Sequence, residues 1–255
     1  MKVVLLAGGK GTRLAEETLL RPKPMVEIGG IPILEHIMRH YAAHGFTDFV
    51  VACGYLGHVI KEHFASYRDR TVDFTVSLGT GAVAYHGNTP QDWNVTLVDT
   101  GMETMTGGRL GRLKDFVGDS TFMMTYGDGL SDIPVGELVR HHKNGDRVAT
   151  VTAVRPPARF GSLVINDDDC VTAFEEKVSS SVALINGGFF VFEPAVFDYL
   201  EDDATPFESL PMERLASAGQ LSAFRHEGFW QPMDTLRDKL ELERLWESGR
   251  APWTP

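Results

Sequence analysis

The chain has 255 residues, 43% of them hydrophobic, which is enough apolar material for one sizeable α/β core. Its formal net charge is −11, from 24 basic and 35 acidic residues, and this argues against nucleic acid or an anionic membrane as the main partner. Two isolated cysteines, no secretory leader and no apolar run of membrane-spanning length predict a reduced, cytoplasmic, soluble protein.

Apolar runs and amphipathic segments alternate along the first half of the chain. The predicted strands cover residues 2–6, 48–53, 72–78, 94–101 and 121–129. The predicted helices cover residues 32–44, 57–67, 108–117 and 135–142, and a loop rich in Gly, Asn and Pro covers 79–92. Because strands and helices alternate, we expect a doubly wound, mostly parallel, Rossmann-like sheet of the α/β class.

Shorter alternating strands characterise the second half. They are predicted at residues 148–154, 162–167, 170–176 and 185–192, and a helix follows at 236–246. This pattern of short alternating strands predicts a mixed or antiparallel annex, meaning further strands added to the main sheet. No repeat or low-complexity linker separates the halves, so we expect a single domain over residues 1–255, with halves 1–150 and 151–255.

A glycine-rich turn directly follows the first strand, in the sequence LLAGGKGTRL. Gly8, Gly9 and Gly11 permit close approach of the backbone to a ligand, and N–H groups at such a turn can bind an anion. Neither a Walker loop nor a dinucleotide fingerprint fits the spacing, and a bare strand-to-helix turn is the alternative. Arg13 and Lys23 lie close in sequence, and two cations favour a polyphosphate site.

Two aspartates are candidate metal ligands. Asp128 lies between two glycines at the end of an apolar strand, the position where open α/β sheets bind ligands. The alternative is that Asp128 belongs to an Asp-Gly turn with no ligand role. Asp234 lies in GFWQPMDT just before a helix, and its alternative role is the N-cap, which Thr235 could fill instead. Since Mg²⁺ binds one or two carboxylates together with phosphate oxygens, the pair predicts a magnesium site.

Other polar groups suggest a sugar-binding or a metal-binding role. Glu176, Lys177 and Asn186 suit sugar hydroxyls and a phosphate, and a solvated strand end is the alternative interpretation for the neighbouring Glu175. His36, His40 and His44 recur at helical spacing and could bind zinc, but histidines that are solvated or that face the C-terminal helix dipole are the favoured interpretation. The chain lacks GxSxG and HExxH motifs, so covalent catalysis is unsupported.

Together, the segments LAGGKGTRL…RPKPM, YGDG, FEEK, INGGFF and FWQPMDT resemble the sugar-nucleotide pyrophosphorylases, nucleotidyltransferases that join an NTP to a sugar 1-phosphate. The longer segments EETLLRPKPMVEIG and GFWQPMDTLRDK are similar to the members that use CTP and glucose 1-phosphate. The resemblance runs nearly end to end. It implies a nucleotide-binding half (1–150), a sugar-phosphate-binding half (151–255), Mg²⁺ as cofactor and a homo-oligomer.

The resemblance also assigns residues. The nucleotide is expected at Leu6, Ala7, Gly8, Gly9, Gly11, Thr12, Arg13, Lys23, Thr104 and Arg109. The sugar phosphate is expected at Tyr126, Glu176, Lys177, Asn186 and Gly187, and the metal at Asp128 and Asp234. Arg13, Lys23 and Asp128 are expected to be catalytic.

Two cations suggest how the nucleotide is recognised. A guanidinium only donates, so Arg109 facing O2 and N3 of cytosine would favour CTP over UTP; contact with ribose, phosphate or a helix end is the alternative. Lys10 is expected to strengthen triphosphate binding through a salt-dependent attraction. A cytidylyltransferase for another acceptor, a non-catalytic sugar-nucleotide-binding protein and a nicotinamide-dependent oxidoreductase are the competing hypotheses.

Overall fold

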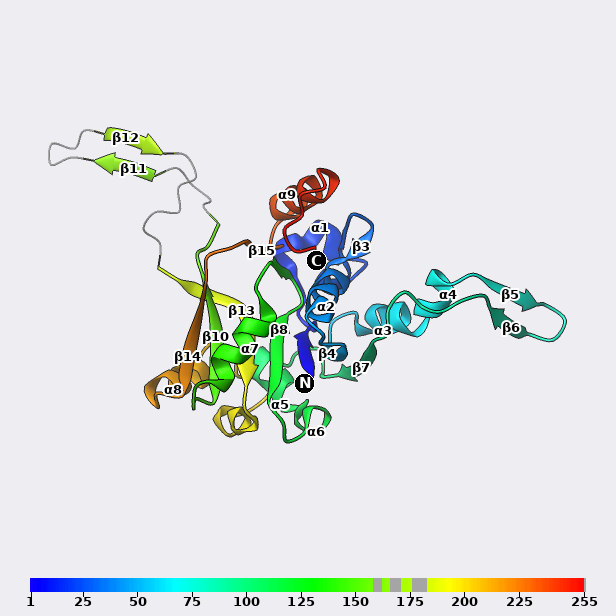
Figure 1. The fold of residues 1–255 in the computed structure, drawn as a ribbon, viewed down its shortest axis with the longest axis horizontal. Helices are drawn as coiled ribbons and strands as arrows, with labels where there is room; N and C mark the ends of the chain where they lie inside the picture. Colours follow the sequence, from blue (N-terminus) through cyan, green and yellow to red (C-terminus); the bar gives the residue numbers. More distant parts are fainter. Residues whose placement is uncertain (158–161, 166–170, 176–182, 255) are drawn as a thin grey trace.

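A central sheet organises the protein, whose computed structural model describes residues 1–157, 162–165, 171–175 and 183–254. The strands of this sheet are β1 (Val3–Leu6), β4 (Asp48–Cys53), β7 (Asn94–Asp99), β8 (Phe122–Tyr126), β10 (Ala149–Val154), β13 (Ile185–Phe192) and β14 (Leu221–His226). They form a seven-stranded sheet in the order β14-β10-β13-β8-β1-β4-β7 (Figure 1).

Most neighbours in this sheet are parallel. β1 pairs in parallel with β4 and β8, β4 with β7, and β10 with β14. β13 is antiparallel to both of its neighbours, β8 and β10. The expected α/β class with a mixed second half is therefore confirmed. The second-half strands β10, β13 and β14 belong to the same sheet as β1, because β13 pairs along the edge of β8.

Helices and short sheets surround the central sheet. The helices are α1 (Ala15–Thr18), α2 (Ile33–Ala43), α3 (Gly57–Ala65), α4 (Tyr67–Thr71), α5 (Thr106–Gly111), α6 (Lys114–Val117), α7 (Val135–Lys143), α8 (Leu210–Ser217) and α9 (Leu236–Glu247), with 3₁₀ turns η1 (Thr12–Leu14), η2 (Lys23–Met25) and η3 (Pro194–Tyr199). The paired short strands are β2 (Glu27–Ile28) with β3 (Ile31–Pro32), β5 (Phe74–Ser77) with β6 (Ala82–Tyr85), β9 (Gly129–Ser131) with β15 (Trp230–Pro232), and β11 (Ser162–Ile165) with β12 (Val171–Glu175). The helix predicted over 108–117 is two short helices, α5 and α6.

The core has two layers, one on each face of the sheet. Along β1, Val3 and Leu5 belong to the cluster that includes α2, whereas Val4 and Leu6 belong to the cluster that includes α5 and α6. Consecutive side chains of a strand point to opposite faces, so a strand covered on both faces must be apolar throughout. This explains the unbroken apolar run before the glycines.

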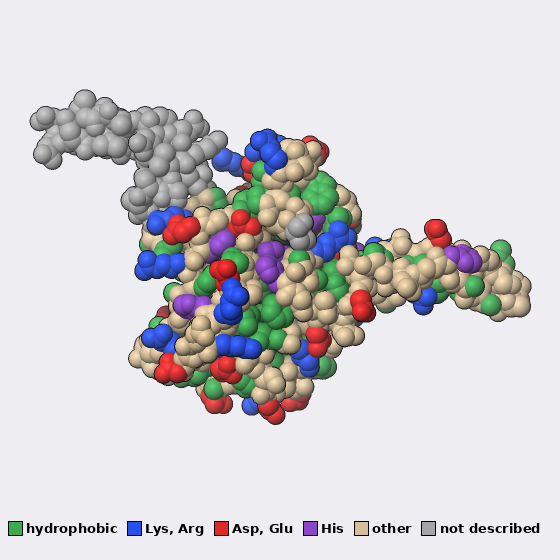
Figure 2. Space-filling view, in the orientation of Figure 1, with side chains coloured by type: hydrophobic (Ala, Val, Ile, Leu, Met, Phe, Trp, Pro, Cys, Tyr) green, Lys and Arg blue, Asp and Glu red, His purple; other side chains and the backbone are tan. Residues whose placement is uncertain are grey.

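Strands β5 and β6 form an arm that stands away from the body (Figure 1). The strand predicted at 72–78 exists but lies outside the central sheet, and the loop predicted over 79–92 contains β6. Gly81 turns the chain with φ +74°, a conformation that glycine adopts without strain. Phe74, Val76 and Leu78 are 43%, 45% and 92% exposed, and Figure 2 shows hydrophobic side chains on this arm.

The two histidines of α2, His36 and His40, are only 2% and 7% exposed, so the expectation that they are solvated is wrong. His36 Nε2 lies 2.8 Å from the Ile28 carbonyl oxygen, and His40 Nε2 lies 2.8 Å from that of Ile133. Over the described ranges, no group of three or more His, Cys, Asp and Glu residues is placed to hold a metal ion. Among the same residues, no helix combines the length and apolar character needed to cross a lipid bilayer.

Candidate active site

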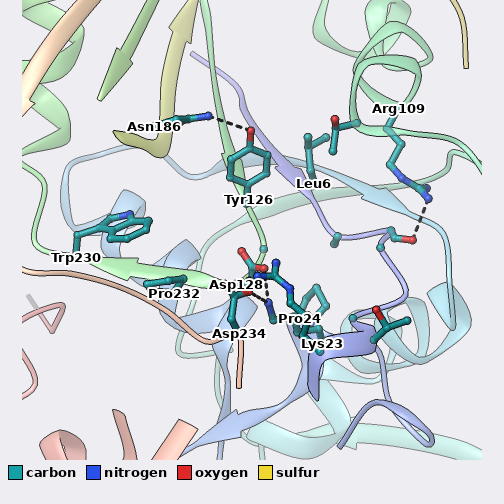
Figure 3. Close-up of a pocket in the computed structure, with 18 residues that line it drawn as sticks. Leu6, Lys23, Pro24, Arg109, Tyr126, Asp128, Asn186, Trp230, Pro232 and Asp234 are labelled. Atoms are coloured by element: carbon teal, nitrogen blue, oxygen red, sulfur yellow. Dashed lines mark hydrogen bonds and ion pairs between the residues drawn. The ribbon is translucent and has the colours of Figure 1, made fainter. Parts of the chain in front are cut away.

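A cavity of about 510 Å³ opens where β1 and β8 end (Figure 3). Both ends are carboxyl ends of parallel strands, the edge at which open α/β sheets bind ligands. The cavity is lined by Leu6, Ala7, Gly8, Gly9, Gly11, Thr12, Arg13, Lys23, Pro24, Thr106, Arg109, Tyr126, Gly127, Asp128, Asn186, Trp230, Pro232 and Asp234. Both halves of the chain therefore contribute to one site.

Lys23 lies between two carboxylates at the floor of the cavity (Figure 3). Its Nζ atom is 2.6 Å from Asp128 Oδ2 and 2.7 Å from Asp234 Oδ1, and the residue is only 7% exposed. Burial disfavours the charged amine, but attraction to Asp128 and the hydrogen bonds to both carboxylates outweigh it and raise the pKa of Lys23. Lys23 is therefore a charged ammonium group inside the cavity.

The two aspartates fit a magnesium site that substrate would complete. Both carboxylates bind the same ammonium nitrogen, so their oxygens converge on one small volume. Asp234 Oδ2 also accepts from Arg13 Nη1 at 2.8 Å. Carboxylate oxygens in this number, with phosphate oxygens supplied by a nucleotide, match the preference of Mg²⁺ for oxygen ligands and few protein groups.

Pairing of two short strands brings Asp234 to Asp128. In the β9–β15 pair, Pro232 lies opposite Gly129, and the backbone N–H of Met233 donates to the Asp128 carbonyl oxygen at 2.9 Å. Asp234 is not the helix cap. Thr235 caps α9 and forms a capping box with Asp238, which leaves the Asp234 carboxylate for the cavity.

The loop that contains Gly8, Gly9 and Gly11, the glycine loop, packs closely against other side chains of the protein. Gly11 has φ +62°, so glycine suits that turn. A Cβ atom on Gly8 would lie 2.2 Å from Arg109 Nη1, and the Gly8 position therefore has no room for a side chain. At the tip of the loop, Lys10 Nζ forms an exposed ion pair with Glu103 at 2.8 Å.

Arg109 lines the cavity but donates extensively to the chain itself. Its Nη1 atom donates at 2.7 Å to Thr100 Oγ1 and to the Gly101 carbonyl oxygen, and its Nη2 atom donates to the Gly8 carbonyl oxygen at 2.9 Å (Figure 3). Burial lowers the pKa of this guanidinium below its ordinary value, yet leaves it a cation. These contacts fasten the glycine loop to residues 100–101. A contact with the base stays a prediction.

The glycines before Arg109 have a packing reason that the sequence did not disclose. A Cβ atom on Gly107 would lie 2.6 Å from the Thr205 carbonyl oxygen, and one on Gly108 would lie 2.4 Å from Asp203 Cα. The segment 203–208 therefore packs directly on the start of α5. Glycine is required at positions 107 and 108 because this segment of the protein, and not a ligand, packs against their backbone.

Tyr126 and Asn186 stand together on the opposite wall (Figure 3). Asn186 Nδ2 donates to the Tyr126 hydroxyl oxygen at 3.5 Å. Burial, followed by the nearby charge of Glu208, raises the pKa of Tyr126 well above its ordinary value, so the phenol is neutral. Trp230 Nε1 donates to the Gly187 carbonyl oxygen at 2.7 Å, which places the indole beside this wall.

The structure brings most of the predicted site residues into this cavity. Thr104 and Gly187 are not among the lining residues. Thr104 is buried beside Gly101, and Gly187 acts through its carbonyl group. Glu176 and Lys177 lie outside the described residues. Sequence reasoning did not identify Pro24, Thr106, Gly127, Trp230 and Pro232 as lining residues, although several of them flank the predicted ones.

Comparison with known proteins gives consistent matches over nearly all of the chain. The family model described as nucleotidyl transferase matches residues 2–238. A glucose-1-phosphate cytidylyltransferase of Salmonella typhimurium is 53% identical over 99% of this chain and 98% of its own length. A Bacillus subtilis protein, named as a probable glucose-1-phosphate cytidylyltransferase, is 44% identical over 99% of each chain.

Solved structures share the fold. HddC from Yersinia pseudotuberculosis superimposes with a TM-score of 0.70 at 21% identity, covering 96% of this chain and 99% of that one. The inositol-1-phosphate CTP transferase of T. maritima superimposes with a TM-score of 0.65 at 16% identity, covering 97% and 96% of the two chains. At these identities the likeness extends to the fold alone.

Proposed function

The chain belongs to the nucleotidyl transferase family, and from that membership we propose that it joins CTP to glucose 1-phosphate, forming CDP-glucose and pyrophosphate. The observation that carries the proposal is the convergence of the glycine loop, Lys23, Asp128 and Asp234 on one cavity. An N–H-rich turn, a buried cation and a carboxylate pair together suit a nucleoside triphosphate with a divalent metal. The names of the full-length relatives support CTP and glucose 1-phosphate as the substrates.

The two halves of the domain would take the two substrates. The glycine loop, Lys23 and Arg109 all belong to residues 1–150 and line the cavity, which supports a nucleotide subsite in that half. Asn186 and Trp230 contribute residues 151–255 to the other wall, which supports a sugar-phosphate subsite there. Tyr126, from the first half, joins that wall through its contact with Asn186. The predicted roles of Glu176 and Lys177 toward the sugar phosphate stay predictions.

The reaction would be an in-line displacement without an enzyme nucleophile. An oxygen of the sugar phosphate attacks the α-phosphorus of CTP, the bond from that phosphorus to the bridging oxygen of the β-phosphate breaks, and pyrophosphate leaves with the electron pair. The attacking phosphate is already ionised, so no general base is needed. Positioning and charge neutralisation then supply the rate enhancement, as in phosphoryl transfer generally.

Different residues of the cavity would position the substrates and neutralise their charge. Backbone N–H groups of the glycine loop would receive the phosphates, Arg13 would face the leaving pyrophosphate, and Lys23 would hold negative phosphate oxygens close to each other. Asp128 and Asp234 would hold Mg²⁺, which when bound supplies additional neutralisation of phosphate charge. The Arg13 side chain is 71% exposed, which leaves it room to turn toward the pyrophosphate.

Three further properties belong to this proposal. We infer Mg²⁺ as the divalent metal, the cytoplasm as the location, and an assembly of several copies of the chain as the active form. Exposed apolar side chains on the β5–β6 arm support self-association, because large exposed apolar patches mark interaction sites. Cys53 is a free, buried thiol, which suits a reducing compartment.

A pyrophosphate-release screen tests the proposal. CTP, UTP, dTTP, ATP and GTP are each combined with glucose 1-phosphate and with other sugar 1-phosphates, with and without Mg²⁺. We expect release with CTP and glucose 1-phosphate only when Mg²⁺ is present. Release with CTP and a different acceptor would replace the sugar assignment. Binding of CDP-glucose without any turnover would instead identify a sugar-nucleotide-binding protein.

A matched pair of variants ties the reaction to this cavity. Asp128→Asn removes one proposed metal ligand, whereas Asp119→Asn changes an exposed aspartate outside the cavity lining. We expect the first variant to need more Mg²⁺ for half-maximal turnover and the second to match the wild type. Unchanged turnover of Asp128→Asn at limiting Mg²⁺ would overturn the role of this carboxylate.

A further inference from the structure

Glu208, which is not among the residues lining the cavity, contacts two hydroxyl groups that are. The Tyr126 hydroxyl donates to Glu208 Oε1, and Thr106 Oγ1 donates to Glu208 Oε2 at 2.6 Å. Tyr126 is the last residue of β8 and contacts Asn186, and Thr106 is the first residue of α5. One carboxylate outside the cavity lining therefore holds two hydroxyl groups of that lining close to each other.

The segment that carries Glu208 is firmly attached to α5. The backbone N–H of Met105 donates to the Asp203 carbonyl oxygen at 2.7 Å, and that of Gly107 donates to the Thr205 carbonyl oxygen at 3.1 Å. The N–H of Phe207 donates to Thr106 Oγ1 at 2.8 Å. The position of Glu208 relative to the two hydroxyls is thus set by contacts between α5 and the residues that immediately precede Glu208.

The carboxylate determines which way the two hydroxyl protons point. An ionised carboxylate only accepts hydrogen bonds, whereas a hydroxyl has one proton and two lone pairs. The protons of Tyr126 and Thr106 are therefore both directed at Glu208. The Asn186 amide donates to the Tyr126 oxygen and the Phe207 N–H donates to Thr106 Oγ1, so each oxygen keeps one further lone pair and can act toward the cavity only as an acceptor.

We propose that Glu208 is a positioning residue that makes Tyr126 and Thr106 acceptors for hydroxyl groups of the acceptor sugar. The inference rests on the proposed function, since it concerns the sugar phosphate of that reaction. Donors at this wall must come from the ligand, and sugar hydroxyls are donors. A phosphate offers only acceptors at neutral pH and would meet the charge of Glu208, so the phosphate groups belong with Arg13 and Lys23 across the cavity.

Steady-state kinetics of Glu208→Gln tests this role. The glutamine amide donates as well as accepts, so one of the two hydroxyls must turn its proton toward the cavity. We expect KM for glucose 1-phosphate to rise about tenfold, the scale of one misdirected hydrogen bond, with KM for CTP changed by less than about twofold. Glu213→Gln, an exposed neighbour on α8, should match the wild type.

Two further measurements separate positioning from general damage. Glu208→Gln should raise KM for glucose 1-phosphate by a smaller factor in the Tyr126→Phe variant than in the wild type. The reason is that part of its effect acts through the Tyr126 hydroxyl, which the Phe variant lacks. Among monodeoxy analogues of glucose 1-phosphate, the one that lacks the donating hydroxyl should be used almost equally by wild type and Glu208→Gln. Additive effects, or equal rises in both KM values, would overturn the inference. Absence of turnover by the wild-type protein would instead overturn the proposed function.

Discussion

Lys23 and Asp128 form a 2.6 Å ion pair on the floor of the cavity, and the same ammonium group lies 2.7 Å from Asp234. A cation of the protein thus lies between the two carboxylates proposed to bind metal. Lys23 would be expected from its loop position to contribute little to folding. Its position between two carboxylates reverses that expectation, because removing the ammonium group leaves two partly buried negative charges side by side without the cation between them.

We predict that Lys23→Ala lowers both catalysis and stability. Loss of one electrostatic stabiliser in a shielded site should reduce kcat/KM by about 10²-fold or more. Loss of the hydrogen bonds from Lys23 to the two carboxylates should reduce the free energy of unfolding by about 2 kcal/mol in metal-free buffer. Added Mg²⁺ should raise Tm of the variant more than Tm of the wild type, since the ion substitutes for the missing cation. Differential scanning fluorimetry with a Mg²⁺ titration measures this, with the exposed Lys143→Ala as control.

Arg109 provides a test of how the base is selected. If its guanidinium reads cytosine, Arg109→Ala should reduce the CTP/UTP ratio of kcat/KM by about tenfold or more. Its contacts with Gly8, Thr100 and Gly101 favour a different result, because the variant would loosen the loop for any nucleotide. We therefore expect similar losses with CTP and UTP, and a lower Tm. A selective loss with CTP would assign the base contact to Arg109.

The Lys10–Glu103 ion pair predicts opposite effects of two substitutions. Lys10→Leu removes a loop cation and should raise KM for CTP by about threefold at low ionic strength. Glu103→Gln leaves Lys10 without its 2.8 Å partner and should lower that KM. Both effects should shrink in about 1 M salt, where the Debye length is only about 3 Å. Measuring KM at two salt concentrations checks this, and a salt-independent change would indicate packing instead.

The buried carboxylate of Glu35 should make the free energy of unfolding fall at acid pH. Burial would raise its pKa, but hydrogen bonds from His63 and Arg39 outweigh burial and lower the pKa from 4.5 to about 2. A depressed folded-state pKa means that Glu35 stabilises the fold above about pH 4.5, and that this contribution is lost as pH falls toward about 2. The shift corresponds to about 3 kcal/mol.

Urea unfolding of Glu35→Gln at several pH values measures this contribution. The variant should be less stable than the wild type at pH 7, and the difference should shrink steadily below about pH 4.5. Glu62→Gln, an exposed neighbour, should show neither effect. A difference between Glu35→Gln and wild type that does not depend on pH would contradict the assignment.

Several parts of the site follow from local sequence. The run of apolar residues in β1 is buried on both faces, and the glycines that follow it border the cavity, as the pattern predicts. Asp128 lies where it was expected because the carboxyl ends of parallel strands meet at one edge of a sheet. Thr235 caps α9 in the manner that its position before the helix suggests.

Other parts depend on pairings between distant segments, which local pattern does not encode. Lys23 and Asp128 are 105 positions apart, and Thr106 and Glu208 are 102 apart. The β9–β15 register delivers Asp234 to Asp128, and the segment 203–208 explains Gly107 and Gly108. By itself, the sequence determined the strand, the glycine turn, the candidate cations and the carboxylates, since each depends only on nearby residues. Only the tertiary structure decided that Lys23 bridges two carboxylates, that Arg109 donates to the glycine loop, and that Glu208 accepts from two hydroxyls. Strand order and packing alone bring those groups within hydrogen-bonding distance.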